Sequence, residues 1–203
     1  MKLAMIIDRR RCFGCHACTV ACKQANATPP GTFWTKVEIS ETGKFPKAKS
    51  TYRPLICNHC DNAPCVEVCP TGASKKLADG TVQVDAEECI GCLSCIDACP
   101  YGARYYNDPD SPVSYWEGNK GPNEYEKERN AEHKVETVDK CTFCAPRRAA
   151  GIPPACVETC IAVARTFGDL DDPKSEISKL FKQHKPKPYM PETGTKPRVF
   201  YID

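Results

Sequence analysis

The chain has 203 residues, a net charge of +2 and an apolar fraction of 41% that includes 16 cysteines. This balanced charge gives no global attraction to nucleic acid or to an anionic membrane surface, and no apolar run approaches the roughly 20 residues that span a bilayer. Without the cysteines the apolar fraction is about a third, which is thin for the core of a chain of this size. We therefore expect bound metal centres to contribute to the stability of the fold.

The N-terminal segment lacks the features of an export signal. Its apolar run, residues 3–7, is too short for the hydrophobic region of a signal peptide. The pair Arg9-Arg10 superficially resembles a twin-arginine signal, but Cys12 follows where an apolar segment would be needed. We therefore expect the chain to carry no export signal of its own.

The cysteines form four groups of four with closely related spacing. The first and third groups read C-x2-C-x2-C-x3-C, the second reads C-x2-C-x4-C-x3-C and the fourth reads C-x2-C-x11-C-x3-C. In two-cluster ferredoxins of the first pattern, three thiolates bind one [4Fe-4S] cluster and the fourth binds the other cluster. No cysteine is left over, so we expect four complete clusters. The quartets are Cys12, Cys15, Cys18, Cys22; Cys57, Cys60, Cys65, Cys69; Cys89, Cys92, Cys95, Cys99; and Cys141, Cys144, Cys156, Cys160.

Two other uses of cysteine explain this pattern less well. Disulfide-rich secreted proteins do not repeat one tight spacing four times. Structural zinc sites favour two separate C-x2-C pairs, in which the third thiol of the first and third quartets has no place. Zinc and disulfides stay open as alternatives, which analysis of iron and acid-labile sulfide would separate.

Each quartet lies in a repeated unit of strand, cysteine loop, short helix and turn. Strand-like runs precede the quartets at residues 3–7, 51–56, 81–85 and 135–138. The second half of every quartet has the form C-x3-C, which we expect to form a short helix. The sequence therefore predicts an α+β fold that is nucleated by the clusters and has long irregular loops.

The spacer lengths indicate how the quartets pair. Only 19 residues separate the second quartet from the third, so these two form a central ferredoxin-like unit, residues 51–104. The first and fourth quartets flank it, and each needs a partner for its fourth thiol. We pair them in an outer unit made of residues 1–50 and 135–170. The prediction is two bacterial-ferredoxin-like units, one inserted in the other.

In this arrangement the last cysteine of each quartet binds the cluster of the paired quartet. The predicted ligands are Cys12, Cys15, Cys18 and Cys160 for cluster 1; Cys57, Cys60, Cys65 and Cys99 for cluster 2; Cys89, Cys92, Cys95 and Cys69 for cluster 3; and Cys141, Cys144, Cys156 and Cys22 for cluster 4. His16 and His59 lie inside complete quartets, so we expect them to tune a cluster or face solvent rather than to be ligands. No catalytic motif accompanies the cysteines, which indicates a non-catalytic electron carrier.

The remaining segments carry weaker signals. Residues 105–134 are polar and interrupted by Pro and Gly, which predicts a long irregular insertion. Residues 171–203 are predicted to be an extended tail that wraps a partner, with a helical stretch at 175–184 and a terminal strand or anchoring patch at 199–202. A basic run is more typical of a solvated face than of a docking site; it comprises Lys44, Lys47 and Lys49. Aromatic residues of the insertion suit a partner surface or an ordinary exposed one; they are Tyr105, Tyr106, Tyr115, Trp116 and Tyr125.

At these motifs the sequence resembles the four-cluster iron–sulfur subunits of the dimethyl-sulfoxide-reductase superfamily. It is most similar to the small subunits of polysulfide, thiosulfate and respiratory arsenate reductases. The matching stretches are CNHCDNAPC at 57–65, CPTGA at 69–73, CPYGAR at 99–104, KCTFC at 140–144, PACVETC at 154–160, GDLDDP at 168–173 and GTKPRVFYI at 194–202.

The resemblance implies a heteromeric complex of anaerobic respiration. A large catalytic subunit would hold a molybdenum or tungsten bis(pyranopterin), and this chain would link it to a quinone-reactive membrane subunit or another redox partner. The terminal substrate would be polysulfide, thiosulfate, arsenate or a similar oxyanion. The outer unit would face the catalytic subunit. Export with a signal-bearing partner would place the chain in the periplasm or at the outer face of the cytoplasmic membrane.

The main alternative is a self-standing cytoplasmic polyferredoxin linked to hydrogenase or formate metabolism. A lone carrier has little use for a long tail and insertion, whereas a subunit can wrap a partner with them. Neither hypothesis involves nucleic acid or a direct membrane span.

Overall fold

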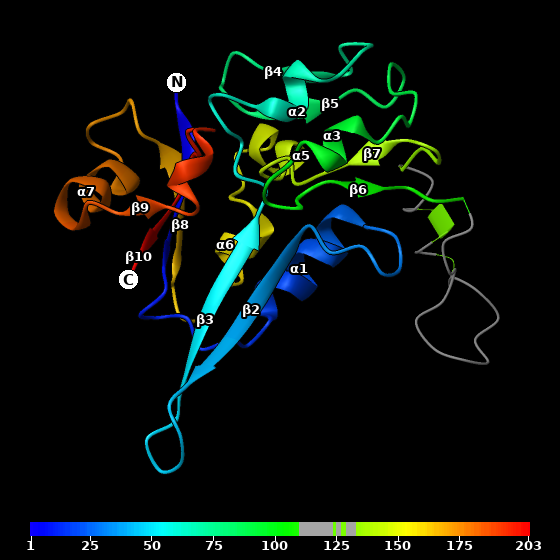
Figure 1. Ribbon diagram of the computed structural model, residues 1–203. Coiled ribbons are helices and arrows are strands. Elements are labelled where there is room, and N and C mark those ends of the chain that lie inside the picture. Colours follow the sequence, from blue (N-terminus) through cyan, green and yellow to red (C-terminus); the bar gives the residue numbers. More distant parts are fainter. Residues whose placement is uncertain (110–123, 125–126, 129–132) are drawn as a thin grey trace.

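The computed structural model describes residues 1–109, 124, 127–128 and 133–203 (Figure 1). Its mixture of short helices and short strands fits the predicted α+β class. The elements are β1 (Leu3–Asp8), α1 (Ala17–Asn26), β2 (Thr35–Thr42), β3 (Lys49–Ile56), α2 (Pro64–Glu67), β4 (Ser74–Lys76), β5 (Val82–Val84), α3 (Ser94–Asp97), β6 (Tyr105–Tyr106), β7 (Val138–Asp139), α5 (Ala145–Ala149), α6 (Ala155–Glu158), β8 (Arg165–Asp169), α7 (Glu176–His184), β9 (Lys187–Pro188), the 3-10 helix η1 (Pro191–Thr193) and β10 (Val199–Ile202).

A four-stranded sheet of order β8-β1-β10-β9 joins both ends of the chain. Strand β1 pairs antiparallel with β8 and parallel with β10, and β9 pairs antiparallel with β10. Because side chains alternate across a strand, β1 serves two cores. Met5 and Ile7 face a core that contains the cysteines, while Ala4 and Ile6 pack on the side of α7.

Helix α7 covers the second face of this sheet. Its N-cap is Ser175, whose Oγ accepts a hydrogen bond from the Ser178 backbone N–H (3.2 Å). Two side chains of the helix pack toward the sheet. Ile177 is buried in this core, and the ring of Phe181 meets Phe200 of β10 edge-on with ring centroids 4.9 Å apart. This small apolar core contains no cysteine.

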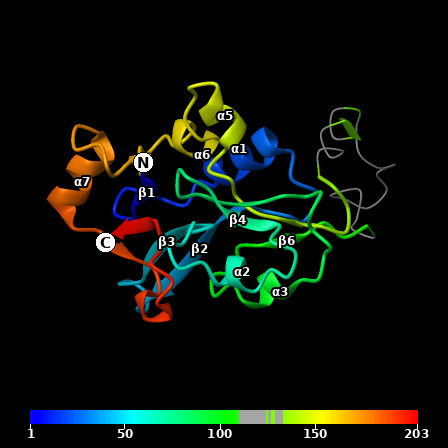
Figure 2. The same ribbon diagram turned by 90° about the horizontal axis from the view of Figure 1, so that it is seen from above.

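The helices of the cysteine units form two groups. Helix α1 packs on α6, and helix α2 packs on α3. Figure 2 shows α1, α5 and α6 gathered on one side and α2 and α3 on the other. The first group carries cysteines of the first and fourth quartets, and the second group carries cysteines of the second and third.

Strands β2 and β3 form a long hairpin that projects from the rest of the chain (Figure 1). At its tip Phe45 is 94% exposed. The basic residues around it are exposed, as expected of a solvated face; they are Lys44, Lys47 and Lys49.

The predicted short elements are largely present. A strand precedes each of the first three quartets, and a helix contains part of every C-x3-C segment. The strand predicted at 135–138 is shorter than expected: β7 begins only at Val138, because Glu136 has a left-handed backbone (φ 60°) within a turn. Residues 110–123, which include Tyr115 and Trp116, and also Tyr125, lie outside the described part of the chain.

The C-terminal segment does not extend away from the molecule, which corrects the prediction of an extended wrapping tail. Helix α7 is present as predicted, but β9 and β10 then return the chain to its own sheet. The apolar run Val199–Ile202 fits between β1 and β9, since its alternate residues fill both cores. Pro188 is tolerated because β9 lies at the sheet edge. Within the described ranges, no helix has the length and hydrophobicity to span a membrane.

Candidate metal centres

The first cavity, here called site 1, lies between α1, the hairpin and the segment after α6. Four of its lining residues are cysteines: Cys12, Cys15, Cys18 and Cys160. Gly14 allows the loop to turn here, since its φ is +72° and a Cβ at this position would lie 2.4 Å from the Tyr52 ring. The space between the lining atoms is about 370 Å³, including the part open to solvent.

Two further cavities lie beside α2 and α3. Site 2 has about 340 Å³ between its lining atoms, and site 3 has about 320 Å³. The three cavities therefore have similar sizes, as expected if each receives the same kind of group. The cysteines that line site 2 are Cys57, Cys60, Cys65 and Cys99. Those that line site 3 are Cys69, Cys89, Cys92 and Cys95.

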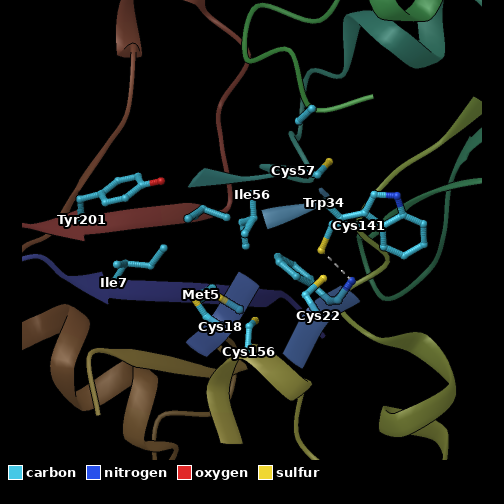
Figure 3. Close-up of a cluster of buried hydrophobic side chains, with 13 residues drawn as sticks. Met5, Ile7, Cys18, Cys22, Trp34, Ile56, Cys57, Cys141, Cys156 and Tyr201 are labelled. Carbon is cyan, nitrogen blue, oxygen red and sulfur yellow. Dashed lines mark hydrogen bonds between the residues drawn. The ribbon is translucent and has the colours of Figure 1, made fainter. Parts of the chain in front are cut away.

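The fourth set, site 4, lies in the main core (Figure 3). Burial raises the pKa of the Cys22 thiol, and the neighbouring thiols of the other three members raise it further. Asn26, at the end of α1, points its Nδ2 at Cys22 Sγ (3.5 Å) and Cys144 Sγ (3.7 Å). The members, all buried, are Cys22, Cys141, Cys144 and Cys156.

The structure thus places the thiols of each predicted ligand set close to one another. The first quartet contributes Cys22 to site 4, and the fourth contributes Cys160 to site 1. The second and third quartets exchange Cys69 and Cys99 in the same manner. Among the described residues, no group of three or more His, Cys, Asp or Glu is arranged to hold a single metal ion.

Burial makes several of these thiols harder to ionise, because their pKa values are raised. Burial raises the pKa of Cys60 to about 12, with a further contribution from Cys57. Burial also raises the pKa of Cys156 to about 11, although Arg165 opposes the shift. Four thiolates crowded in such a site are stabilised when they coordinate a positively charged metal centre. The donor set therefore fits an iron–sulfur cluster.

Several N–H groups already point at cysteine sulfur. The backbone N–H of Phe143 donates to Cys141 Sγ at 3.4 Å, which is the dashed line in Figure 3. Equivalent bonds run from Ser74 to Cys69 Sγ (3.4 Å) and from Ala164 to Cys160 Sγ (3.3 Å). Such donors stabilise negative charge on sulfur and tune cluster potentials.

Comparison with known proteins agrees with this geometry. Two family models, both described as 4Fe-4S dicluster domain, match the chain, one at residues 48–115 and 121–170 and the other at residues 11–73. The arsenate respiratory reductase iron-sulfur subunit ArrB of Shewanella sp. (strain ANA-3) is 42% identical over 226 residues, which cover 100% of this chain and 96% of that protein. The chain belongs to the iron–sulfur subunits of dimethyl-sulfoxide-reductase-family complexes. The resemblance seen in the motifs is therefore confirmed.

Other relatives of this iron–sulfur subunit come from complexes with different names. A subunit of the tetrathionate reductase of Salmonella typhimurium is 42% identical over 206 residues, covering 99% of this chain and 72% of that protein. A subunit of the selenate reductase of Mesobacillus selenatarsenatis is 40% identical over 209 residues, covering 98% of this chain and 70% of that protein.

The two loop histidines of the iron–sulfur subunit have different surroundings. His16 is exposed beside site 1. His59 is fully buried beside site 2, accepts a hydrogen bond at Nδ1 from Val82 N–H (3.0 Å) and stacks on Phe143 with ring centroids 3.8 Å apart. Burial and the nearby Lys140 hold its pKa well below the ordinary value, so the ring is neutral.

The sites of the iron–sulfur subunit follow one another in a definite order. Arg165 lies beside Cys18 of site 1 and Cys156 of site 4. Burial raises the pKa of Tyr105, and thiols of sites 2 and 4 raise it further. Burial likewise raises the pKa of Cys141 in site 4, followed by the effect of Cys57 in site 2. Arg104 lines site 2 and donates to Oγ of Ser74, which lines site 3. The order is therefore site 1, site 4, site 2, site 3.

Among the described residues, three buried cations near the cysteines were not predicted from the sequence: Arg104, Lys140 and Arg165. The ammonium of Lys140 donates to the carbonyl oxygens of Val82 and, at 2.6 Å, of Cys141. The two arginines had a detectable signal, because each follows the last cysteine of its quartet by five residues. Arginine side chains are normally exposed and vary freely in position. An arginine at the same position in two repeats is therefore unusual.

Proposed function

We propose that this subunit binds four [4Fe-4S] clusters, one at each of sites 1 to 4, and carries electrons within an oxidoreductase complex. The observation that supports this most is the crossed grouping of the thiols, in which each paired set contains one cysteine from a distant quartet. When bound, thiolate-ligated clusters of this type supply one-electron transfer at potentials that the protein sets.

The exposure of the cysteines divides the four sites into two outer and two inner ones. Site 1 has an exposed cysteine, Cys15, and site 3 has another, Cys92. All four cysteines of site 4 are buried, and none in site 2 is exposed. The protein thus shields the middle of the row from water and leaves both of its ends accessible to partners.

Apolar side chains surround the accessible ends. Phe13, Ile161 and Val163 are exposed near site 1, and Ile90 and Leu93 are exposed at site 3. Exposed apolar groups beside a redox centre suit protein docking. In our proposal a molybdenum or tungsten pterin catalytic subunit binds at the site 1 end, and a quinone-linked membrane subunit or other redox partner binds at the site 3 end.

The proposal retains the nested organisation. The outer unit consists of residues 1–50 and 135–170, and the central unit consists of residues 51–104. Supporting this division, α1 packs on α6 within the outer unit, and α2 packs on α3 within the central unit. Residues 171–203 complete the sheet of the outer unit through β10.

The physiological setting is also proposed from the relatives. Their names refer to reduction of arsenate, tetrathionate and selenate. We place this subunit in a comparable complex of anaerobic respiration that reduces an oxyanion or a sulfur compound. We also place it at the outer face of the cytoplasmic membrane, which fractionation of cells carrying a tagged chain would test.

Anaerobic purification from the native cell tests the function. We expect about 16 iron atoms and as many acid-labile sulfides per chain, together with a co-purifying large subunit that contains molybdenum or tungsten. Colourless protein that contains zinc would refute the cluster proposal. A brown monomer near 22.5 kDa in native extract would instead favour a self-standing polyferredoxin.

A further inference from the structure

Arg104 and Arg165 occupy equivalent places in the two cysteine units. Each follows the last cysteine of the later quartet in its pair by five residues, after Cys99 and Cys160 respectively. Their exposed fractions are only 4% and 3%. The corresponding position after Cys69 is Ser74, so the central pair has one arginine and not two.

Arg165 lies between site 1 and site 4. Its Nη2 donates to Cys18 Sγ at 3.4 Å and to Thr35 Oγ1 at 3.0 Å. The guanidinium also lowers the pKa of Cys156, a member of site 4. One buried cation is therefore shared by thiols of two neighbouring sites.

Arg104 has the same relation to site 2 and site 3. It lines site 2, and its charge is stabilised by Cys65 of that site and by Cys95 of site 3. Its Nη1 donates to Ser74 Oγ at 2.7 Å. Its Nε and Nη2 atoms are buried and have no hydrogen-bond partner among the described residues, so these N–H groups are available to an anion.

Among the described residues, no acidic side chain forms a salt bridge with either arginine. The neighbours that most affect their charge are cysteines, together with Tyr201 beside Arg165, and no carboxylate of the described residues is among them. A buried cation without a counter-ion is energetically unfavourable, because burial removes its hydration. That cost is offset when the adjacent sites hold anions, and a cluster with four thiolates is an anion whose negative charge increases on reduction.

We propose that Arg104 and Arg165 each raise the reduction potentials of both clusters in their own pair and hold the two anions side by side. This inference rests on the proposed function, because it requires clusters at all four sites. The physical cause is direct: a fixed positive charge in a site of low dielectric favours the reduced, more negative state. Since each guanidinium lies between two sites, it acts on both at once.

The test uses the variants Arg104→Met and Arg165→Met, which remove the charge and keep an unbranched side chain. Reduction potentials are measured in the intact complex by redox titration monitored by electron paramagnetic resonance. We expect Arg165→Met to lower the potentials of clusters 1 and 4 by at least 59 mV, a tenfold change in a one-electron equilibrium. Arg104→Met should lower those of clusters 2 and 3 to a similar extent. In each variant the other pair should move by less than half as much.

Two further variants separate charge from packing. Arg165→Lys and Arg104→Lys keep the charge, and we expect them to recover most of the lost potential. Arg11→Met removes an exposed charge one residue from Cys12, which solvent screens, and should leave all four potentials unchanged. Equal shifts in all four clusters, or no shift in variants that contain full iron, would overturn the inference.

Iron analysis of each variant keeps the outcomes distinct. If a methionine variant lacks only the two clusters of its own pair and the lysine variant retains them, the result supports a charge that holds the anionic pair. If the lysine variant loses them as well, the role is packing and the inference fails. Absence of four clusters from the unmodified protein would refute the proposed function itself.

Discussion

The side-chain amide of Asn26 lies 3.7 Å from the sulfur of Cys144, a residue 118 positions later in the chain. The same Nδ2 atom is 3.5 Å from Cys22 Sγ. Its backbone oxygen in turn contacts His133 Nε2 at 2.7 Å, and the other ring nitrogen of His133 lies 2.5 Å from Asp139 Oδ2. A residue at the end of α1 is therefore fixed where it can donate to two thiols of site 4.

We expect Asn26→Leu to lower the potential of cluster 4, because the loss of N–H···S bonds destabilises the more negative reduced state. The decrease should be on the order of 50 mV, close to the 59 mV of a tenfold change in a one-electron equilibrium. Redox titration of the holoprotein measures it. Asn62→Leu is the matched control, since Asn62 donates to a backbone oxygen, Gly194 O, and lies on the exposed surface. A potential unchanged in Asn26→Leu would show that this amide has no influence on the cluster.

The crossed ligand sets predict which cluster each cysteine serves. Cys22→Ser should alter the cluster spectrum in the same way as Cys141→Ser, and Cys160→Ser should match Cys12→Ser. The reason is that Cys22 lies with the fourth-quartet thiols and Cys160 lines site 1. Difference spectra by electron paramagnetic resonance, compared in these two pairs, check the assignment. If Cys22→Ser instead matched Cys12→Ser, each quartet would serve its own cluster and the pairing would be wrong.

The sequence allowed the cysteine grouping to be predicted because its constraints are local. A C-x2-C-x2-C loop can surround only one small centre, and a fourth thiol on the following helix is carried away from that centre. The central pairing followed from the short spacer between the second and third quartets. The outer pairing followed because the two remaining quartets each needed a partner, and α1 does lie against α6.

Other features depend on long-range packing and were missed. The segment 185–191 has the prolines of an extended tail, yet strand β10 lies between β1 and β9 in the sheet. Its alternate side chains pack into the apolar cores on the two faces of that sheet. The burial of Arg165 likewise depends on Thr35 of the hairpin, which is distant in sequence. A local pattern contains no information about such partners.

The N-cap of α7 can be tested without disturbing a cluster site. Ser175→Ala removes the oxygen that accepts the Ser178 N–H, which should cost about 1 kcal/mol of local stability. Ser175→Asp keeps an acceptor at the cap and should exchange like the unmodified protein. Hydrogen exchange of the first-turn amides of α7 should quicken roughly fivefold in the alanine variant. Equal exchange in the alanine and aspartate variants would contradict a capping role.

Substitutions at two adjacent residues of β1, Met5 and Ile6, should have different effects on stability and on the reduction potentials. Ile6 is 1% exposed and faces the apolar core beneath α7, whereas Met5 faces the cysteine core and has its sulfur 3.8 Å from Arg165 Nη1. Ile6→Ala should lower the free energy of unfolding by about 2–5 kcal/mol, because it leaves a cavity in a packed core.

Since cluster proteins unfold irreversibly, the measurement is the half-life of the visible cluster absorbance at a fixed elevated temperature. Ile6→Ala should shorten that half-life while leaving all four reduction potentials unchanged. Met5→Ala should shorten it and also shift the potentials of clusters 1 and 4, since the contact with Arg165 is lost. Ile39→Ala, at a position that is 55% exposed on the hairpin, is the control and should change neither quantity. A shifted potential in Ile6→Ala would show that the two faces of β1 are not independent.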